Sequence, residues 1–178
     1  MRPAARNPRQ PRDAASDYRE KSAYEISRLA KEMKEQGYPT PLGDPTSGIM
    51  LVLEQPAGPR PLEALRRSLH AVGLPEAYVT YESTGLLARE IPAVQPQVLV
   101  AVGPGAARDI DAIDYPLARQ TFSEAQPGVW FPWSRGTAGL TLPAIAPALR
   151  DDATKRRFWR TFLSLRTVSQ QRSGAARP

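Results

Sequence analysis

The sequence predicts an α/β domain with three layers, α/β/α, and a mainly parallel central sheet. Short apolar runs alternate with stretches of helical periodicity from residue 49 onward. Two of these runs, Ile49–Leu53 and Val98–Val102, are apolar at every position, which is typical of strands buried on both faces. The connections between runs are short, and strand–helix–strand units of this kind form right-handed crossovers in a doubly wound sheet.

The N-terminal region precedes this alternating pattern. Residues 1–15 contain four arginines and three prolines and almost no apolar side chain, so we expect a flexible basic arm. Residues 16–36 are predicted to form a helix, because Ile26, Leu29 and Met33 recur at helical spacing and Gly37 follows. A connector rich in proline and glycine then leads to the first strand.

The remaining elements are assigned in chain order. The predicted strands are 49–53, 77–81 and 97–102, with weaker candidates at 129–133 and 139–142. The predicted helices are 61–72, 85–91, 106–113 and 152–165. Pro92 is expected to end the helix at 85–91, because proline interrupts helical hydrogen bonding. Residues 16–166 are thus predicted as a single domain, followed by a flexible basic tail at 167–178.

The composition excludes several classes of site. The chain has 178 residues, 41% of them hydrophobic, which is enough for one domain with a real core. It has no cysteine, which excludes disulfides, iron–sulfur clusters and thiolate zinc sites. His70 is the single histidine, and we expect it to lie exposed on the polar side of its helix. We therefore expect no metal and no cofactor.

The net charge of +6 and the isoelectric point near 10 favour an anionic partner, with DNA as the leading candidate. The same composition could instead reflect a biased genome. No apolar run is long enough to span a bilayer, and the basic N-terminus lacks the apolar region of a secretory signal. We expect a cytoplasmic protein that could associate with the nucleoid.

A candidate site follows from the sheet, because ligands of open α/β sheets bind outside the carboxyl ends of the strands. The segments expected there are 54–58, 81–84 and 103–105. Gly103 and Gly105 flank Pro104 between a strand and a helix, where backbone N–H groups could bind a DNA phosphate. The alternative is a tight turn without a ligand.

The last predicted helix offers a second candidate DNA contact. Lys155, Arg156, Arg157 and Arg160 interleave with Phe158, Trp159 and Phe162. Cations beside aromatic rings suit a nucleic-acid strand, whose phosphates pair with arginine and whose bases stack on rings. The rings could equally be core residues, with the cations on an ordinary solvated face.

Four motifs in order give the chain a resemblance to a known family. They are the strand ending Leu53-Glu54-Gln55-Pro56-Ala57-Gly58, the strand ending Thr80-Tyr81, the run from Glu90-Ile91 to Gly103, and the segment from Leu142 through Ala146-Pro147 to the basic helix with Trp159. In this order and spacing, residues 45–166 resemble the uracil-DNA glycosylase superfamily. The resemblance implies the family's three-layer fold and a base-binding pocket at the carboxyl ends of the strands.

The resemblance also shows altered positions in that pocket. Tyr81 stands where the family has the asparagine that reads uracil, and Ala146 where it has the histidine that stabilises the departing base. Leu53 replaces a glycine that lets the backbone approach the base, and the aromatic loop expected after Gly58 is missing. A pocket formed by Leu53, Pro56, Tyr81, Glu82, Ala146 and Pro147 would therefore bind uracil poorly.

Three functional interpretations stay open. The first is a DNA-binding protein with a glycosylase-like fold and lost or weak base excision, acting in DNA repair or replication, with a protein partner in that machinery. The second is a divergent glycosylase that hydrolyses the N-glycosidic bond of uracil or a damaged base. In it, Glu54 or Gln55 orients water and Tyr81 or Glu82 reads the base. The third is a structural or inhibitory protein-interaction module on the same fold.

Overall fold

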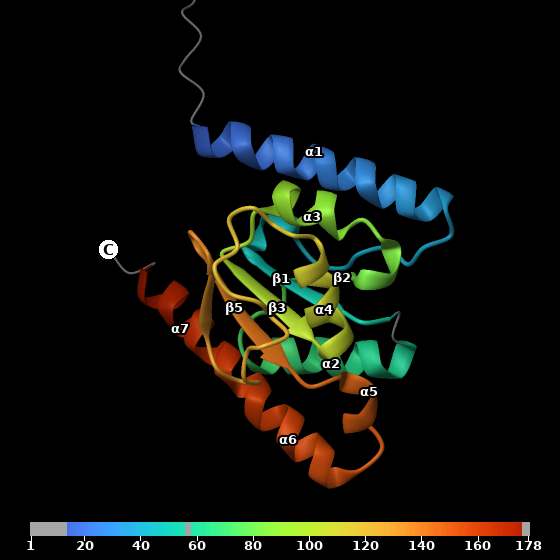
Figure 1. The fold of residues 1–178 in the computed structure, drawn as a ribbon, viewed down its shortest axis with the longest axis vertical. Helices are drawn as coiled ribbons and strands as arrows, with labels where there is room; N and C mark the ends of the chain where they lie inside the picture. The colour runs from blue at the N-terminus through green and yellow to red at the C-terminus, as the bar shows by residue number, and fades with distance from the viewer. Residues whose placement is uncertain (1–13, 56–57, 176–178) are drawn as a thin grey trace, which may run out of the picture.

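The computed structural model describes residues 14–55 and 58–175. A central sheet of five strands has helices on both faces, which confirms the α/β class and the three layers (Figure 1). The strands are β1 (Ile49–Leu53), β2 (Tyr78–Tyr81), β3 (Val98–Val102), β4 (Phe131–Ser134) and β5 (Thr137–Leu142). Their order is β2-β1-β3-β5-β4, and all neighbours are parallel except β4 and β5. The prediction that β1 and β3 are neighbouring inner strands is confirmed.

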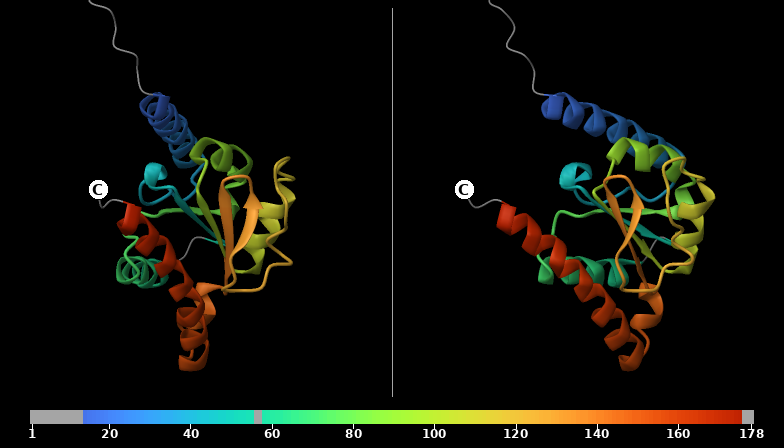
Figure 2. Two further views of the ribbon diagram at one scale, coloured as in Figure 1. Left: turned by 90° about the vertical axis from the view of Figure 1, so that its left-hand side faces the viewer. Right: turned by 60° about the vertical axis from the view of Figure 1, so that its left-hand side comes forward.

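The helices form the two outer layers. They are α1 (Ala14–Glu35), α2 (Pro59–Ala71), α3 (Leu87–Val94), α4 (Pro104–Ala112), α5 (Ile145–Ala148), α6 (Asp152–Phe162) and α7 (Arg166–Ala175). Short 3-10 turns lie at Pro45–Ser47, Glu82–Thr84 and Leu163–Leu165. One layer holds α1, α3 and α4, and the other holds α2 and α6, as Figure 2 shows from two further directions.

Alternation along the inner strands explains why both faces of the sheet are covered. Leu51 and Leu53 of β1 point into an apolar cluster with α2 and α6, whereas Met50 and Val52 point into a second cluster with α1, α3 and α4. Every residue of β1 and β3 is buried. An all-apolar strand is therefore what this position in the sheet requires.

The long helix α1 is fixed to the sheet through α3. Ile26 and Leu29 contribute to the second apolar cluster. In addition, the Ser22 hydroxyl donates to the Ala93 carbonyl at 2.7 Å, and the Tyr18 hydroxyl donates to the Val94 carbonyl at 3.0 Å. These two hydroxyls satisfy carbonyl groups at the end of α3 that have no partner within the helix.

Both edge strands of the sheet have features that limit further strand pairing. At the β2 edge, Leu42 exchanges two backbone hydrogen bonds with Val79, at 2.8 and 2.9 Å. At the other edge, β4 contains Pro132, which pairs with Ala138 and is exposed. The Ala138 N–H points away from β4 and donates to the Gln97 carbonyl next to β3. Pro132 therefore faces Ala138 without a hydrogen bond, and its own backbone nitrogen points to the outer side of β4.

Two predicted boundaries are wrong. Pro92 lies inside α3, which continues to Val94. A proline there removes one hydrogen bond, and the helix ends only at Gln95, whose backbone is left-handed (φ 46°). The last predicted helix also extends further than its predicted end at residue 165, because residues 166–175, which the sequence assigned mainly to the tail at 167–178, form α7. Leu163 and Arg166 keep helical backbone angles, so α6 continues into α7, and Val168 packs against the first apolar cluster.

The basic arm predicted for residues 1–15 lies almost entirely outside the described residues. The structure describes Ala14 as the first residue of α1, so this helix begins two residues before its predicted start.

Candidate functional site

The carboxyl ends of β2, β1 and β3, three of the four parallel strands, lie level with one another. Leu53 at the end of β1 pairs with Tyr81 of β2 and with Val102 of β3. Glu54, Glu82 and Gly103 therefore follow the last paired residues of three adjacent strands. This register brings the predicted segments to one edge, as expected for a ligand-binding crevice.

Glu54 is bonded to the loop that begins α4. Its Oε1 accepts a hydrogen bond from the backbone N–H of Gly105 at 2.5 Å. Gly105 lies in the first turn of α4, where unbonded N–H groups and the helix dipole favour a negative charge. The Gly105 N–H, which the sequence suggested as a donor to a DNA phosphate, is thus bonded to a carboxylate of the chain itself.

The two glycines of this loop make room for Glu54. A Cβ at Gly103 would overlap the Glu54 carboxyl group, and one at Gly105 would lie 3.0 Å from Glu54 Oε1. Gly103 also has φ +101°, which side chains other than glycine rarely adopt. The Gly-Pro-Gly sequence is therefore explained by contact with Glu54.

A pocket of about 230 Å³ opens beside Glu54. It lies between the ends of β1 and β3, the start of α2, and α5. Its lining residues are Leu53, Glu54, Gln55, Gly58, Pro61, Val102, Ala144, Ile145 and Ala146. Apart from backbone groups, Glu54 and Gln55 supply the polar side chains of this lining.

The pocket unites four of the predicted site residues, Leu53, Glu54, Gln55 and Ala146. Tyr81, Glu82 and Pro147 are not part of its lining, and Pro56 lies outside the described residues. Sequence reasoning missed the wall formed by Ala144, Ile145 and Val102. These residues could have been included from the sequence, because they end or closely follow predicted strands, where the crevice was expected.

Tyr81 is directed into the core. Its side chain is 2% exposed and belongs to the apolar cluster on the α2 side of the sheet, together with Leu53 and Leu65. Burial raises the pKa of the Tyr81 hydroxyl above its ordinary value. Tyr81 therefore contributes to packing, and it is not among the residues that line the pocket.

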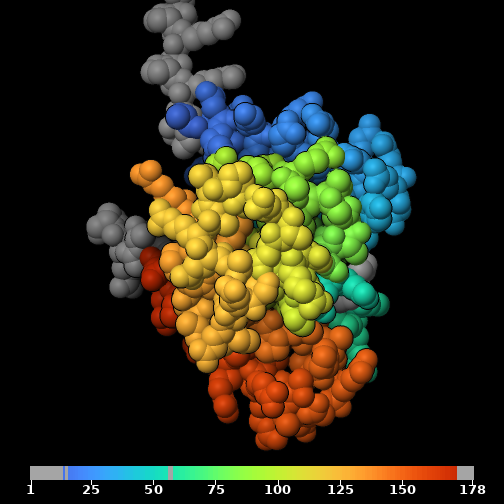
Figure 3. Space-filling view, in the orientation of Figure 1, coloured from blue at the N-terminus to red at the C-terminus, as the bar shows by residue number. Residues whose placement is uncertain are grey.

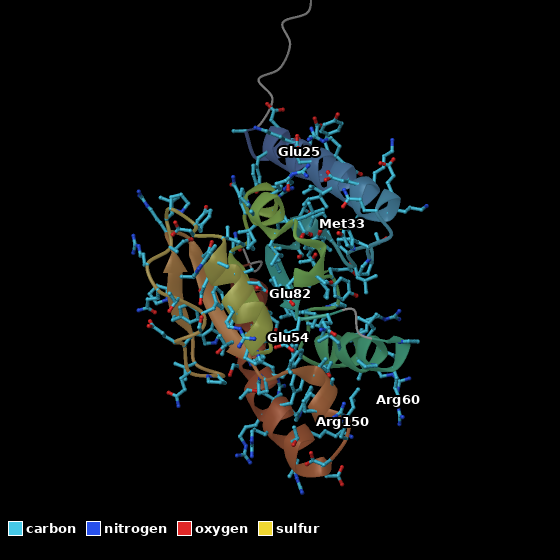
Figure 4. The ribbon with its side chains drawn as sticks, turned by 45° about the vertical axis from the view of Figure 1, so that its right-hand side comes forward. Glu25, Met33, Glu54, Arg60, Glu82 and Arg150 are labelled. Carbon is cyan, nitrogen blue, oxygen red and sulfur yellow. The ribbon has the colours of Figure 1, made fainter. Side chains whose placement is uncertain are left out.

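Glu82 lies at the same end of the sheet as Glu54 (Figure 4). Its Oε2 is buried and has no hydrogen-bond partner among the described residues. Glu82 begins the short turn Glu82–Thr84, which packs against α4. The structure thus places a second carboxylate near the start of α4 but outside the pocket.

A buried polar cluster on the opposite face of the sheet was not predicted. Glu90 of α3 is 0% exposed and accepts hydrogen bonds from the hydroxyls of Tyr78 at 2.6 Å and Thr80 at 3.0 Å. Burial raises the pKa of the Glu90 carboxyl, an effect that the two hydrogen bonds partly offset. The sequence did contain an indication of this cluster. Tyr78 and Thr80 alternate along a buried strand, so their hydroxyls lie on one face of the sheet and need a hydrogen-bond partner there.

The basic residues of α6 are all on its outer side. Phe158 and Phe162 are buried, so these two rings are core residues, as the alternative interpretation held. Lys155, Arg156, Arg157 and Arg160, named here the α6 cations, are exposed. Among the described residues, none of them forms an ion pair within 4.0 Å.

The α6 cations belong to a longer stretch of the chain that is rich in basic residues. Between Arg150 and Arg166 the chain has six basic and two acidic residues, so this short stretch holds most of the net charge. The acidic pair is at the start of α6, where Asp151 caps the helix by accepting from the Thr154 N–H at 2.8 Å. Figure 4 shows Arg150 and Arg60 on adjacent elements below Glu54, and Figure 3 shows the α5–α6 region protruding at one end.

Other site types find little support in the described part of the chain. No group of three or more histidine, cysteine, aspartate or glutamate side chains there could hold a metal ion. His70 is exposed on α2, as predicted. None of the described helices combines the length and apolar character needed to cross a membrane.

No protein-family model matches this chain, and no curated protein shows significant sequence similarity to it.

Proposed function

We propose that this chain is a DNA-binding protein with a uracil-DNA glycosylase-like fold, in which base excision is lost or weak. It would act in DNA repair or replication, together with a protein partner, in the cytoplasm or on the nucleoid. The observation that carries the proposal is the group of exposed α6 cations, none of which forms an ion pair within 4.0 Å in the part of the chain that the structure describes. Unpaired cations bind phosphates at lower cost, because no internal ion pair has to be broken first.

Weak excision is supported by the chemistry of the pocket. Cleavage of a glycosidic bond leaves negative charge on the departing base, which a glycosylase stabilises with positioned donors. Ala146 has no donor at the position where the family has histidine. Glu54 adds a carboxylate whose Oε1 is already bonded to Gly105.

Salt-dependent DNA binding tests the proposal. Affinity for a short DNA should fall steeply with salt, and Arg156→Gln with Arg160→Gln should lower the slope of log affinity against log salt by about 1 for each lost phosphate contact. The matched control is Lys31→Gln with Arg67→Gln. This control removes the same number of positive charges from α1 and α2, where Lys31 pairs with Glu35 and Arg67 pairs with Glu63. Equal slopes for both variants would contradict a DNA contact at α6.

Removal of residues 1–13 tests the contribution of the basic arm in the same assay. The shortened chain should show a smaller slope than the full chain, because four arginines are lost. If the full chain does not bind DNA at low salt, the protein-interaction alternative replaces the proposal.

A divergent active glycosylase is the second candidate. The observation in its favour is that Glu54 and Gln55 both line a pocket of about 230 Å³. An abasic-site cleavage assay on uracil-containing DNA separates the candidates. Rapid excision by the unmodified chain that is abolished by Gln55→Ala would establish the second candidate and overturn the first.

A further inference from the structure

Trp159 is the outermost ring of a three-ring stack on α6. Its ring lies nearly parallel to Phe162, with an interplanar angle of 14° and 5.9 Å between centroids. Phe162 stacks in turn on Phe158 at 5.5 Å. Phe162 is 0% exposed and Phe158 is buried, whereas Trp159 is 37% exposed. The two phenylalanines fill the core and support a tryptophan that remains open to solvent.

The surroundings of Trp159 on the helix are basic. Lys155 and Arg156 precede it by four and three residues, so they share its helix face. Both are exposed, and neither forms an ion pair within the part of the chain that the structure describes. Arg160 follows directly along the chain. A flat aromatic ring therefore lies among exposed cations.

We propose that Trp159 is a stacking platform for an unpaired base, so that this face of α6 prefers single-stranded DNA over duplex. The inference rests on the proposed DNA-binding function and adds the strand state of the partner. A base in a duplex has both faces stacked, whereas an unpaired base can stack on an aromatic ring. The nearby cations would then bind the phosphates on either side of that base. Charge complementarity thus favours a nucleic-acid strand over an apolar partner.

Fluorescence offers a direct test, because the three tryptophans differ in exposure. Trp133 is 2% exposed and Trp130 is partly buried, which leaves Trp159 as the most accessible. Titration with an oligothymidylate of about ten nucleotides should quench the emission of the unmodified chain. The Trp159→Phe variant should lose that quenching, while the Trp133→Phe variant should keep it.

Affinity measurements complete the test. Trp159→Ala should weaken binding to the oligothymidylate roughly 5- to 150-fold, the range expected for one base–aromatic stack, with Trp159→Phe in between. Binding of a duplex of the same length should change less than twofold. Thermal unfolding of both variants checks that the fold is retained.

The outcomes separate this inference from the function on which it rests. If Trp159→Ala binds the single strand as well as the unmodified chain does, and no quenching occurs, the stacking platform is refuted while DNA binding stands. Equal weakening on duplex and single strand refutes the strand preference. Failure of the unmodified chain to bind either DNA at low salt refutes the proposed function and the stacking platform together.

Discussion

The Glu54 side chain and the Gly105 backbone are joined by a hydrogen bond of 2.5 Å that connects the end of β1 to the first turn of α4. The bond links a strand to a helix 51 residues further along the chain. It also uses a helix end that would otherwise be open to an external anion. Glu54 therefore has a structural role in addition to its position in the pocket.

Glu54→Ala should lower the free energy of unfolding by about 1–2 kcal/mol, because a charge-assisted hydrogen bond at a helix end is lost. Glu54→Gln should cost less, since the amide oxygen still accepts from Gly105. Urea unfolding measures both. Gln55→Ala is the control and should change stability by less than about 0.5 kcal/mol, as expected for an exposed residue. A Glu54→Ala variant as stable as the control would show that the bond contributes nothing.

Gly103→Ala should be far more damaging than Gly37→Ala. Both glycines have positive φ, +101° and +75°, but a Cβ at Gly37 would meet no atom within 4 Å, whereas one at Gly103 would overlap Glu54. Gly37→Ala should cost about 1 kcal/mol from backbone strain alone. The extra cost at Gly103 should shrink in a Glu54→Ala background, with a coupling energy of about 1 kcal/mol or more. Additive effects of the two substitutions would disprove the steric contact.

Glu90→Gln should change how stability depends on pH. The folded pKa of Glu90 is raised, so the native state binds more protons than the unfolded state between the ordinary carboxyl value of about 4.3 and the raised value. The contribution of Glu90 is therefore fully present below about pH 4 and is lost as pH rises through the folded pKa. Thermal unfolding from pH 4 to 8 should show a smaller decline for Glu90→Gln. The matched control is Glu63→Gln on the exposed surface, which should leave the decline unchanged.

From the resemblance alone, Ala146→His together with Tyr81→Asn is expected to give some uracil excision, and less if the missing loop after Gly58 also matters. The burial of Tyr81 changes this expectation. Tyr81→Asn should cost about 3 kcal/mol or more, because it leaves a cavity and places an amide among apolar side chains. Ala146→His lies at the exposed pocket wall and should be tolerated. Thermal unfolding and an excision assay on each single variant check this, and a stable Tyr81→Asn variant would contradict it.

The parts of the fold that follow a simple pattern could be predicted from the sequence. The strands β1 and β3 are apolar throughout because both faces are covered, so their central position could be inferred. The helix α7 could not, because residues 166–175 include Val168 as the one large apolar side chain and depend on continuation from α6. Pro92 was misleading for a similar reason, since tertiary packing of α3 outweighs one lost hydrogen bond.

The sequence predicted which segments meet at the strand ends, but it did not predict which side chains contact one another there. The rule for carboxyl ends of parallel strands brought residues 54, 82 and 103 to one edge, and the strand register has them there, because register depends on backbone pairing. The Glu54–Gly105 bond and the Glu90 cluster join residues from separate elements, and a single sequence does not show which side chains meet. The face to which Tyr81 points depends on alternation along β2, which a motif comparison does not consider.

The two edges of the sheet have a consequence for self-association. Unpaired strand edges are templates on which a second chain can add a strand, and such addition leads to aggregation. Leu42 already occupies the outer side of β2, and Pro132 offers no N–H on the outer side of β4. Once the sheet is complete, neither edge readily accepts a strand from a second copy of the chain, and edge-to-edge aggregation is disfavoured.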